Sequence, residues 1–445
     1  MNLTFKLADQ RSKDVVKNVV RSFLVKIIST IVTLSLVPIS LGYVDKGSYG
    51  VYLTIASVVT WFSIFDFGLV NGLTNRISEA LVNDDVKLVR SYLSTTYVFL
   101  FFFVIFILSL YFLLDSNLNW NTIFNTKINE RSLRLALRLT VISFCLLFLL
   151  KPITSLLMVK QLHFIANGIM VAGNFLSLAL IYFCGHLFTN SFVFLVAALV
   201  FTYPLCLLIY SIIYYIKEPF LRPTIASFKF TYKRKLFGLS IKFFIIQISV
   251  IVILTSNNFL IAQFTDNDTV TLYNIAYRYF SIATIFQLMF VHPLWAAFSE
   301  AFAKKDFAWI KKIIAQINRL NFFLVLGLVG MLLVNKFAYS VWLGPEIEVP
   351  QHINIYLSIY FSLTLFVQAY VHFINGAGTL NLQVLYSLIT LMLHYPTAYL
   401  LMKVCNFGVD GLLILNIFWA VLALILWKMQ YEVIIIRKNL QRIWR

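Results

Sequence analysis

Seven basic side chains lie within long apolar runs of this 445-residue sequence: Arg21, Lys26, Arg134, Arg138, Lys151, Lys242 and Arg278. A cation at the centre of a membrane helix costs about 2.5–3.5 kcal/mol on insertion scales, so each needs a partner or water. The same runs contain few acids, chiefly Asp66, with Asp410 at an edge. We therefore expect that carboxylates within the runs cannot neutralise all of these cations.

The depth of each cation decides its interpretation. Arg21 and Lys242 lie near predicted helix ends, where a long side chain can reach the headgroups. Lys26, Arg138 and Arg278 lie deeper, which predicts a water-filled cavity that faces an anionic substrate. A guanidinium matches two phosphate oxygens at once, so a phosphate-bearing substrate fits this cavity well. Arg21 and Lys242 are further candidates for the same substrate-binding cavity.

Three other polar residues are candidates for gating or for coupling to an ion gradient: Asp66, His292 and His394. His292 precedes Pro293, and His394 lies two residues before Pro396. Proline at such places predicts helix kinks that can act as hinges. A single histidine on an apolar helix is most often a packing residue. Coupling to H⁺ or Na⁺ stays open as the alternative, and no cofactor is expected.

Motifs for enzymatic chemistry are absent from the sequence. It contains no Gly-x-x-x-x-Gly-Lys-Ser/Thr phosphate loop, no nucleophile elbow and no metal-ligand cluster. The four cysteines lie in or beside apolar runs without metal-ligand spacing, so we interpret them as inert small residues. We predict no catalytic residue and no metal site, and the protein is not expected to be an enzyme.

The elements that must position these residues are membrane helices. Of the residues, 60% are hydrophobic and only 12% are charged, whereas a soluble domain keeps roughly a quarter charged. A spanning helix needs about twenty apolar residues. Twelve runs meet that length, which predicts an all-α integral membrane protein: 18–41, 48–71, 92–114, 132–157, 164–184, 191–216, 237–261, 270–298, 320–342, 352–375, 380–402 and 409–431.

Basic loops set the predicted orientation. A net charge of +18 would indicate nucleic acid in a soluble protein, but here the basic residues gather in short loops between apolar runs. With the N-terminus inside, the outer loops hold only Lys46, Lys127, Arg131 and Lys403. Cytoplasmic loops of membrane proteins carry the excess of Lys and Arg. Both termini are therefore predicted to be cytoplasmic, membrane lipids are the expected surroundings, and no nucleic acid is expected.

An internal repeat divides the chain into two six-helix lobes. Ser78-Glu79-Ala80-Leu81, followed by Asp85, matches Ser299-Glu300-Ala301-Phe302, followed by Asp306, at an offset of 221 residues. Such a match near half the chain length indicates duplication. The predicted lobes are 1–216 and 237–445, the latter with a basic cytoplasmic tail, joined by a basic cytoplasmic linker at 217–236. Two lobes of even helix number are expected to be related by an axis along the membrane normal.

One segment of the first lobe resembles a known family. Leu41-Gly42, Tyr49-Gly50-Val51-Tyr52, the stretch from Trp61 to Leu69 and the stretch from Asn71 to Ala80 resemble the Wzx-type polysaccharide flippases. This family belongs to the superfamily that includes the MATE exporters and the lipid II flippases. The resemblance concentrates in residues 38–97 and implies a MATE-like fold for the whole chain.

The resemblance implies a flippase of the bacterial inner membrane. Its substrate would be a polyprenyl-pyrophosphate-linked oligosaccharide, such as an O-antigen repeat unit of lipopolysaccharide biosynthesis, carried from the inner to the outer leaflet by alternating access. Enzymes of polysaccharide assembly would then be its partners. Two alternatives stay open: a MATE-type multidrug or cation antiporter, which needs buried acids, and a membrane polysaccharide polymerase or ligase, which needs a sizeable outer loop.

Overall fold

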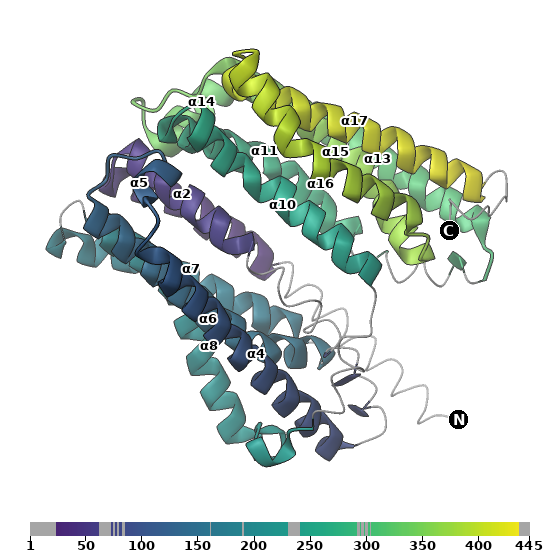
Figure 1. The fold of residues 1–445 in the computed structure, drawn as a ribbon. Helices are drawn as coiled ribbons and strands as arrows, with labels where there is room; N and C mark the ends of the chain where they lie inside the picture. The colour runs from purple at the N-terminus through teal and green to yellow at the C-terminus, as the bar shows by residue number, and fades with distance from the viewer. Residues whose placement is uncertain are drawn as a thin grey trace. The chain divides into compact units, whose positions relative to one another are not determined.

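Every regular element among the described residues of this computed structural model is a helix (Figure 1). The described residues are 24–61, 85–160, 162–188, 191–229, 241–291 and 304–435, with single positions from 73 to 81 and from 294 to 302. They form two units, residues 1–240 and 241–445. The predicted all-α membrane fold is confirmed.

The first unit consists of long helices joined by short turns. They are the helix Leu24–Tyr43, α2 (Lys46–Trp61), α4 (Val86–Asp115), the single turn α5 (Trp120–Ile123), α6 (Glu130–Val159), α7 (His163–Cys184) and α8 (Phe192–Lys217). Short 3₁₀ turns follow at Gly185–Leu187, Pro219–Leu221 and Ile225–Ser227. Helix α6 is central, because α2, α4, α7 and α8 all pack against it.

Helices α7 and α8 approach each other very closely at one glycine. A Cβ atom on Gly173 would lie 2.6 Å from the Cα of Tyr203. One turn along α7, the hydroxyls of Ser177 and Thr202 lie 2.5 Å apart. Small residues that allow backbones to approach and hydroxyls that bond across helices are the means by which helices associate in a membrane. This pair therefore fixes α8 against α7.

The beginning of the predicted linker at 217–236 lies along α4. The Nε of Arg90 donates to the carbonyl of Arg222 at 2.9 Å, and the N–H of Thr224 donates to the hydroxyl of Ser94 at 3.0 Å. The N–H of Lys229 also donates to the hydroxyl of Thr95, at 3.2 Å. Residues 218–229 are thus held by the first unit.

The second unit repeats the plan. It contains α10 (Ile241–Phe264), α11 (Asn267–Val291), α13 (Phe307–Leu333), the short α14 (Asn335–Leu343), α15 (Gln351–Ala377), α16 (Asn381–Tyr399), a π-helical turn (Leu400–Val404) and α17 (Gly408–Ile435). Helix α15 is central and packs against α11, α13 and α17, whereas α16 packs chiefly along α10.

The sequence repeat is also a repeat of helix starts. Helices α2 and α11, α4 and α13, and α6 and α15 each begin 221 residues apart. Asp85 accepts a hydrogen bond from the backbone N–H of Leu88 at 2.9 Å, and Asp306 accepts one from Trp309 at 3.0 Å. Each of these aspartates therefore caps the N-terminus of its helix in the same way, which supports the duplication.

A second pair of caps shares the offset and was missed in the sequence. Asp45 accepts from the N–H and hydroxyl of Ser48, at 2.9 and 2.7 Å, and Asp266 accepts from those of Thr269, at 2.7 and 3.0 Å. Burial works to raise the pKa of the Asp45 carboxyl, but the Ser48 hydrogen bonds outweigh it and hold this pKa below its usual value. An Asp-x-x-Ser/Thr pattern at both positions was the available signal.

Nine helices of the described part are long and apolar enough to cross a membrane: Leu24–Tyr43, Val86–Asp115, Glu130–Val159, Phe164–Leu187, Phe192–Lys217, Phe307–Leu333, Gln351–Ala377, Asn381–Val404 and Gly408–Ile435. The chain is therefore a multi-pass membrane protein. Helices α10 and α11 have 24 and 25 residues, so each is about 36 Å long and can also span.

Two helix starts differ from the prediction. Helices α4 and α13 begin at Val86 and Phe307, several residues before the predicted 92 and 320, because Asp85 and Asp306 cap them there. The 30 residues of α4 measure about 45 Å, longer than the roughly 30 Å hydrocarbon core. The extra turns carry Lys87 and Arg90, which supplies basic side chains beyond the apolar part of the helix.

Two glycines of α7 give a matched test of the close approach. We expect Gly173→Ala to lower the free energy of unfolding by about 1–3 kcal/mol, because the new methyl meets backbone. Gly168→Ala should cost nothing, since a Cβ there meets no atom within 4 Å. Thermal unfolding in detergent, followed by tryptophan fluorescence, compares the two. Equal midpoints would contradict the close packing of α7 on α8.

The repeated caps predict equal and independent losses. Asp85→Ala and Asp306→Ala should each destabilise the protein by about 1 kcal/mol, because each leaves helical N–H groups without an acceptor. Asp→Asn at the same sites keeps the acceptor and serves as the control. The two losses should add, since the caps belong to separate units. Chemical unfolding measures them, and a loss at one site alone would show that the two caps are not equivalent.

Candidate functional site

The outer end of α4 carries an acid that the sequence analysis placed beyond the membrane run. Asp115 is the last residue of α4, and its side chain is only 3% exposed. The Nε and Nη2 of Arg138 donate to its Oδ2 at 2.9 and 2.7 Å. Arg134 donates to the carbonyl oxygen of Asp115 and, at 2.8 Å, to a carboxylate oxygen of Glu130. Both arginines of α6 are therefore paired with acids.

Aromatic groups complete this cluster. The indole Nε1 of Trp120 donates to Asp115 Oδ1 at 2.8 Å, and the Trp120 ring stacks on Tyr111 at 6.1 Å between centroids. Asp115 thus ties α4, the turn α5 and α6 together. A carboxylate this buried needs such partners, because an unpaired charge there would be costly.

The cluster changes how Arg138 is interpreted. The sequence offered no acid for it within the runs, whereas the structure gives it a two-donor hydrogen bond to Asp115. Its side chain remains 45% exposed, so the guanidinium keeps free donors toward the surroundings. A structural role is therefore established by geometry, and a substrate-binding role for Arg138 stays a prediction.

The other predicted cavity residues of the first half are only partly described. Lys26 is exposed on the helix Leu24–Tyr43, and its carbonyl accepts a hydrogen bond from the Thr30 hydroxyl at 3.0 Å. Arg21 and Asp66 lie outside the described residues. Lys26 is thus the first-half candidate whose side chain has no described acidic partner within hydrogen-bond or ion-pair distance.

Arg278 lies in a polar part of the second unit. It is half-buried on α11, and its neighbour one turn earlier, Asn274, donates to Asn258 Oδ1 of α10 at 2.8 Å. Beside this bond, the Asn257 amide donates to the Tyr273 hydroxyl at 3.0 Å. The α10–α11 contact near Arg278 is therefore lined by amides and hydroxyls, which suits a cation better than hydrocarbon does.

Lys242, His292 and His394 complete the set of predicted residues. Lys242 lies in the first turn of α10, its side chain outside the described part, and His292 lies outside the described residues. His394 on α16 is 3% exposed, and neither ring nitrogen has a hydrogen-bond partner. The structure brings none of these three together with Arg278 among the contacts of the described side chains.

A buried amide network on α11 was missed. Gln287 donates to Asn321 Oδ1 and to the Leu365 carbonyl, both at 2.6 Å, and Asn321 donates to the same carbonyl at 3.0 Å. The network joins α11, α13 and α15. Gln287 stands 221 residues after Asp66, so the repeat itself marked the position as polar in both halves.

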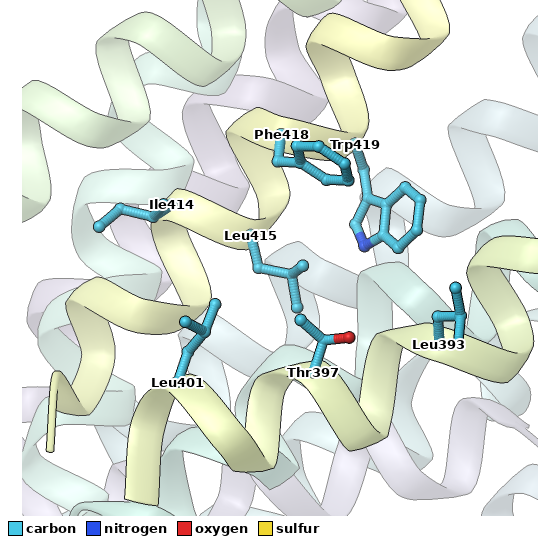
Figure 2. A pocket seen from close by; sticks show the side chains of 7 residues that line it. All are labelled: Leu393, Thr397, Leu401, Ile414, Leu415, Phe418 and Trp419. Atoms are coloured by element: carbon cyan, nitrogen blue, oxygen red, sulfur yellow. The ribbon is translucent and has the colours of Figure 1, made fainter. Parts of the chain in front are cut away.

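One cavity of the second unit is apolar and excludes an anion. It has a volume of about 340 Å³ and lies between α16, the π-helical turn and α17 (Figure 2). Its lining consists of Leu393, Thr397, Leu401, Ile414, Leu415, Phe418 and Trp419. Only the Thr397 hydroxyl and the Trp419 indole offer polar atoms there, and no charged side chain does. This cavity suits a hydrocarbon chain and not a phosphate.

Solved structures place this fold, although no protein-family model and no curated protein sequence matches the chain. An inward-facing multidrug resistance MATE family transporter of the MOP superfamily matches with a TM-score of 0.72, 14% identity and coverage of 94% of this chain and 96% of that one. An outward-facing one gives 0.67, 13%, 96% and 97%. A MOP superfamily transporter from Pyrococcus furiosus gives 0.63, 12%, 95% and 97%.

These matches define the class of fold. The chain has the fold of MATE transporters of the MOP superfamily, over nearly its full length and that of the matched proteins. Identities of 12–14% carry the fold and not the substrate. The predicted MATE-like architecture is therefore confirmed, and the choice of substrate depends on the charged residues of this chain.

A double-mutant cycle tests the Asp115 cluster. We expect Asp115→Ala to lower the free energy of unfolding by about 1–3 kcal/mol, because it leaves Arg138 and Trp120 donors without their acceptor. Arg138→Ala should cost less, since Trp120 and Arg134 still contact Asp115. Unfolding of both single variants and the double variant gives a coupling energy of about 0.5–3 kcal/mol. A coupling near zero would remove the structural role of the pair.

Proposed function

We propose that the protein is a flippase for an anionic lipid-linked oligosaccharide. The cargo class is a polyprenyl-pyrophosphate-linked sugar chain, such as an O-antigen repeat unit, moved from the inner to the outer leaflet of a bacterial cytoplasmic membrane. The pyrophosphate and sugars need a polar, cationic path. The prenyl chain can remain in hydrocarbon throughout.

The observation that carries this proposal is the sign of the charge within the helices. In the described spanning helices, every Asp or Glu lies in a first or last turn: Asp115, Glu130, Asp268, Asp410 and Glu432. Arg278, in contrast, lies eleven residues into α11, about 16 Å along its axis and so near the middle of a roughly 30 Å core. A cation at mid-depth without acids at that depth favours an anionic cargo.

The fold admits pockets of different polarity. The Pyrococcus furiosus transporter with this fold is described as having a binding pocket of reverse polarity, which suggests a different function for it. Likeness in fold to multidrug transporters therefore does not fix the sign of the cargo. In this chain we assign the sign from Arg278 and Lys26.

The proposed roles follow from side-chain chemistry. The planar guanidinium of Arg278 can donate two parallel hydrogen bonds to non-bridging phosphate oxygens, and the Lys26 ammonium adds a point charge. The Asn258–Asn274 amide pair beside Arg278 supplies dipoles that hold sugar hydroxyls or water. The groups act by binding and orienting the cargo, and alternating access moves it.

A MATE-type drug or cation antiporter is the second candidate, favoured by the names of the matched structures. Organic cations need a buried carboxylate at their binding site. Among the described spanning segments the acids are confined to the helix ends, and Asp66 lies outside them. The same binding experiment distinguishes the two candidates.

Ligand-induced thermal stabilisation decides between them. Purified protein in detergent is heated with a polyprenyl-pyrophosphoryl oligosaccharide or with a lipophilic dye cation. A ligand at 100 times its Kd adds about 2.7 kcal/mol, which is readily measured. We expect stabilisation by the anionic lipid alone. Stabilisation by the dye alone would replace the flippase with a drug exporter.

Substitution of Arg278 locates the site. Arg278→Ala should abolish stabilisation by the anionic lipid and flipping in proteoliposomes, while Arg278→Lys should retain part of both because it keeps the charge but loses the two-donor geometry. Lys26→Ala should be intermediate. Arg138→Ala, a change in a residue already paired with Asp115, is the control at equal charge loss. Wild-type flipping by Arg278→Ala would contradict a cationic site at this position.

A further inference from the structure

A line of buried polar side chains runs along one face of α16. It consists of Gln383, Ser387, Thr390 and His394, whose spacing of four, three and four residues places them on a single helix face. All four are at most 5% exposed. From Gln383 to His394 the line covers about 16 Å, from the first turn of the helix toward its middle. We call these four residues the α16 polar line.

The polar line faces α10. Helix α16 packs chiefly along α10, so its buried face is the face that α10 covers. The ring of Phe264, at the end of α10, lies 5.6 Å from that of Tyr399 and 6.4 Å from that of Tyr395. With this alignment, the buried Asn257 and Asn258 of α10 stand about one turn from the level of His394. Both helices thus contribute polar groups to the interface.

Several of these buried atoms lack partners. Both ring nitrogens of His394, the Oε1 of Gln383 and the Oδ1 of Asn257 have no hydrogen-bond partner among the described residues. An unsatisfied buried polar group costs about 1–3 kcal/mol, so helix association alone would select apolar residues or bonded pairs here. These atoms together require water or a transferable proton in the interface.

The surroundings of His394 hold no compensating charge at its level. On α10 the only charged residue is Lys242, in the first turn; on the π-helical turn it is Lys403; on α17 the charged residues are Asp410, Lys428 and Glu432, toward its two ends. Of the tyrosines on α16, Tyr386 donates to the Trp419 carbonyl, and Tyr395 and Tyr399 contact Phe264. A protonated His394 would therefore need water for solvation.

Two irregularities of the helix follow directly after His394. Pro396 lies inside α16 and removes one backbone donor, and the helix then continues as the π-helical turn Leu400–Val404. A π-turn within a helix is frequent at functional sites. Gly411 of α17 lets this turn approach closely, since a Cβ there would lie 3.0 Å from the Leu401 carbonyl carbon. A change of hydration at His394 thus acts beside a place where the helix can bend.

We propose that His394 is the proton-binding site that couples this protein to a proton gradient, and that the α16 polar line conducts the proton to it. A ring nitrogen takes the proton from water, and the imidazolium returns it to water on the other side of the membrane. The imidazolium favours a conformation in which the α10–α16 interface is hydrated, so proton uptake shifts the conformational equilibrium. Histidine and neutral amides offer no carboxylate to Na⁺, so the ion is the proton. The inference rests on the proposed transport function for its purpose.

The test uses no cargo, so its outcome is independent of the flippase proposal. A cysteine-free protein carries Leu187→Cys in the first unit and Phe407→Cys in the second, both exposed, with a spin label on each. Electron–electron distance distributions are recorded in lipid nanodiscs at about pH 5.5 and pH 8. His394→Gln is compared with His372→Gln, the matched control, because buried His372 already has a partner in the Gln368 carbonyl.

We expect a pH-dependent distance change in the wild type and in His372→Gln, and its loss in His394→Gln. A response retained by His394→Gln, or no response in the wild type, would overturn the proposal. If His394→Gln does not fold, the other five of the six histidines are replaced instead. Nitrogen NMR of the remaining ring then reads its protonation, and a ring that stays neutral down to about pH 4.5 in every conformation would equally overturn it.

Discussion

Inside a bilayer every peptide group must find its hydrogen bond within the protein, and this constraint shapes the whole chain. It leaves helices as the only regular element among the described residues, and it makes each polar side chain in a helix a question of partners. Asp115 answers by gathering two arginines and an indole, and Gln287 answers by joining three helices. Where the answer is incomplete, as at His394, the structure indicates function and not only packing.

The polar groups of the chain therefore divide into two kinds. Fully bonded clusters hold helices together, and the Asp115 cluster shows that a charge within a helix can belong to this kind. Arg278 and the α16 polar line differ, because amides and hydroxyls surround the first and unbonded atoms mark the second. Both lie in the second unit, so cargo binding and ion coupling are proposed within one set of neighbouring helices, α10, α11 and α16.

Hydropathy predicted the helices well because twenty apolar residues in sequence have one stable solution in lipid. It placed the starts of α4 and α13 too late, because the capping residues Asp85 and Asp306 lie in polar sequence that hydropathy does not read. It also left Arg138 without a partner, since Asp115 is 23 residues distant and was counted as loop. The α16 polar line, in contrast, was present in the sequence as a four-three-four spacing that depth-based reasoning about charges overlooked.

The coincidence of helix starts at one offset also bears on biosynthesis. Because residues 1–240 contain their own caps, their own central helix α6 and the contacts that hold residues 218–229 against α4, they need nothing from the second unit to define their helices. The first half of the chain can then complete its insertion and packing while the ribosome is still translating the second. A duplicated gene thus yields a large membrane protein that assembles in two small, sequential steps.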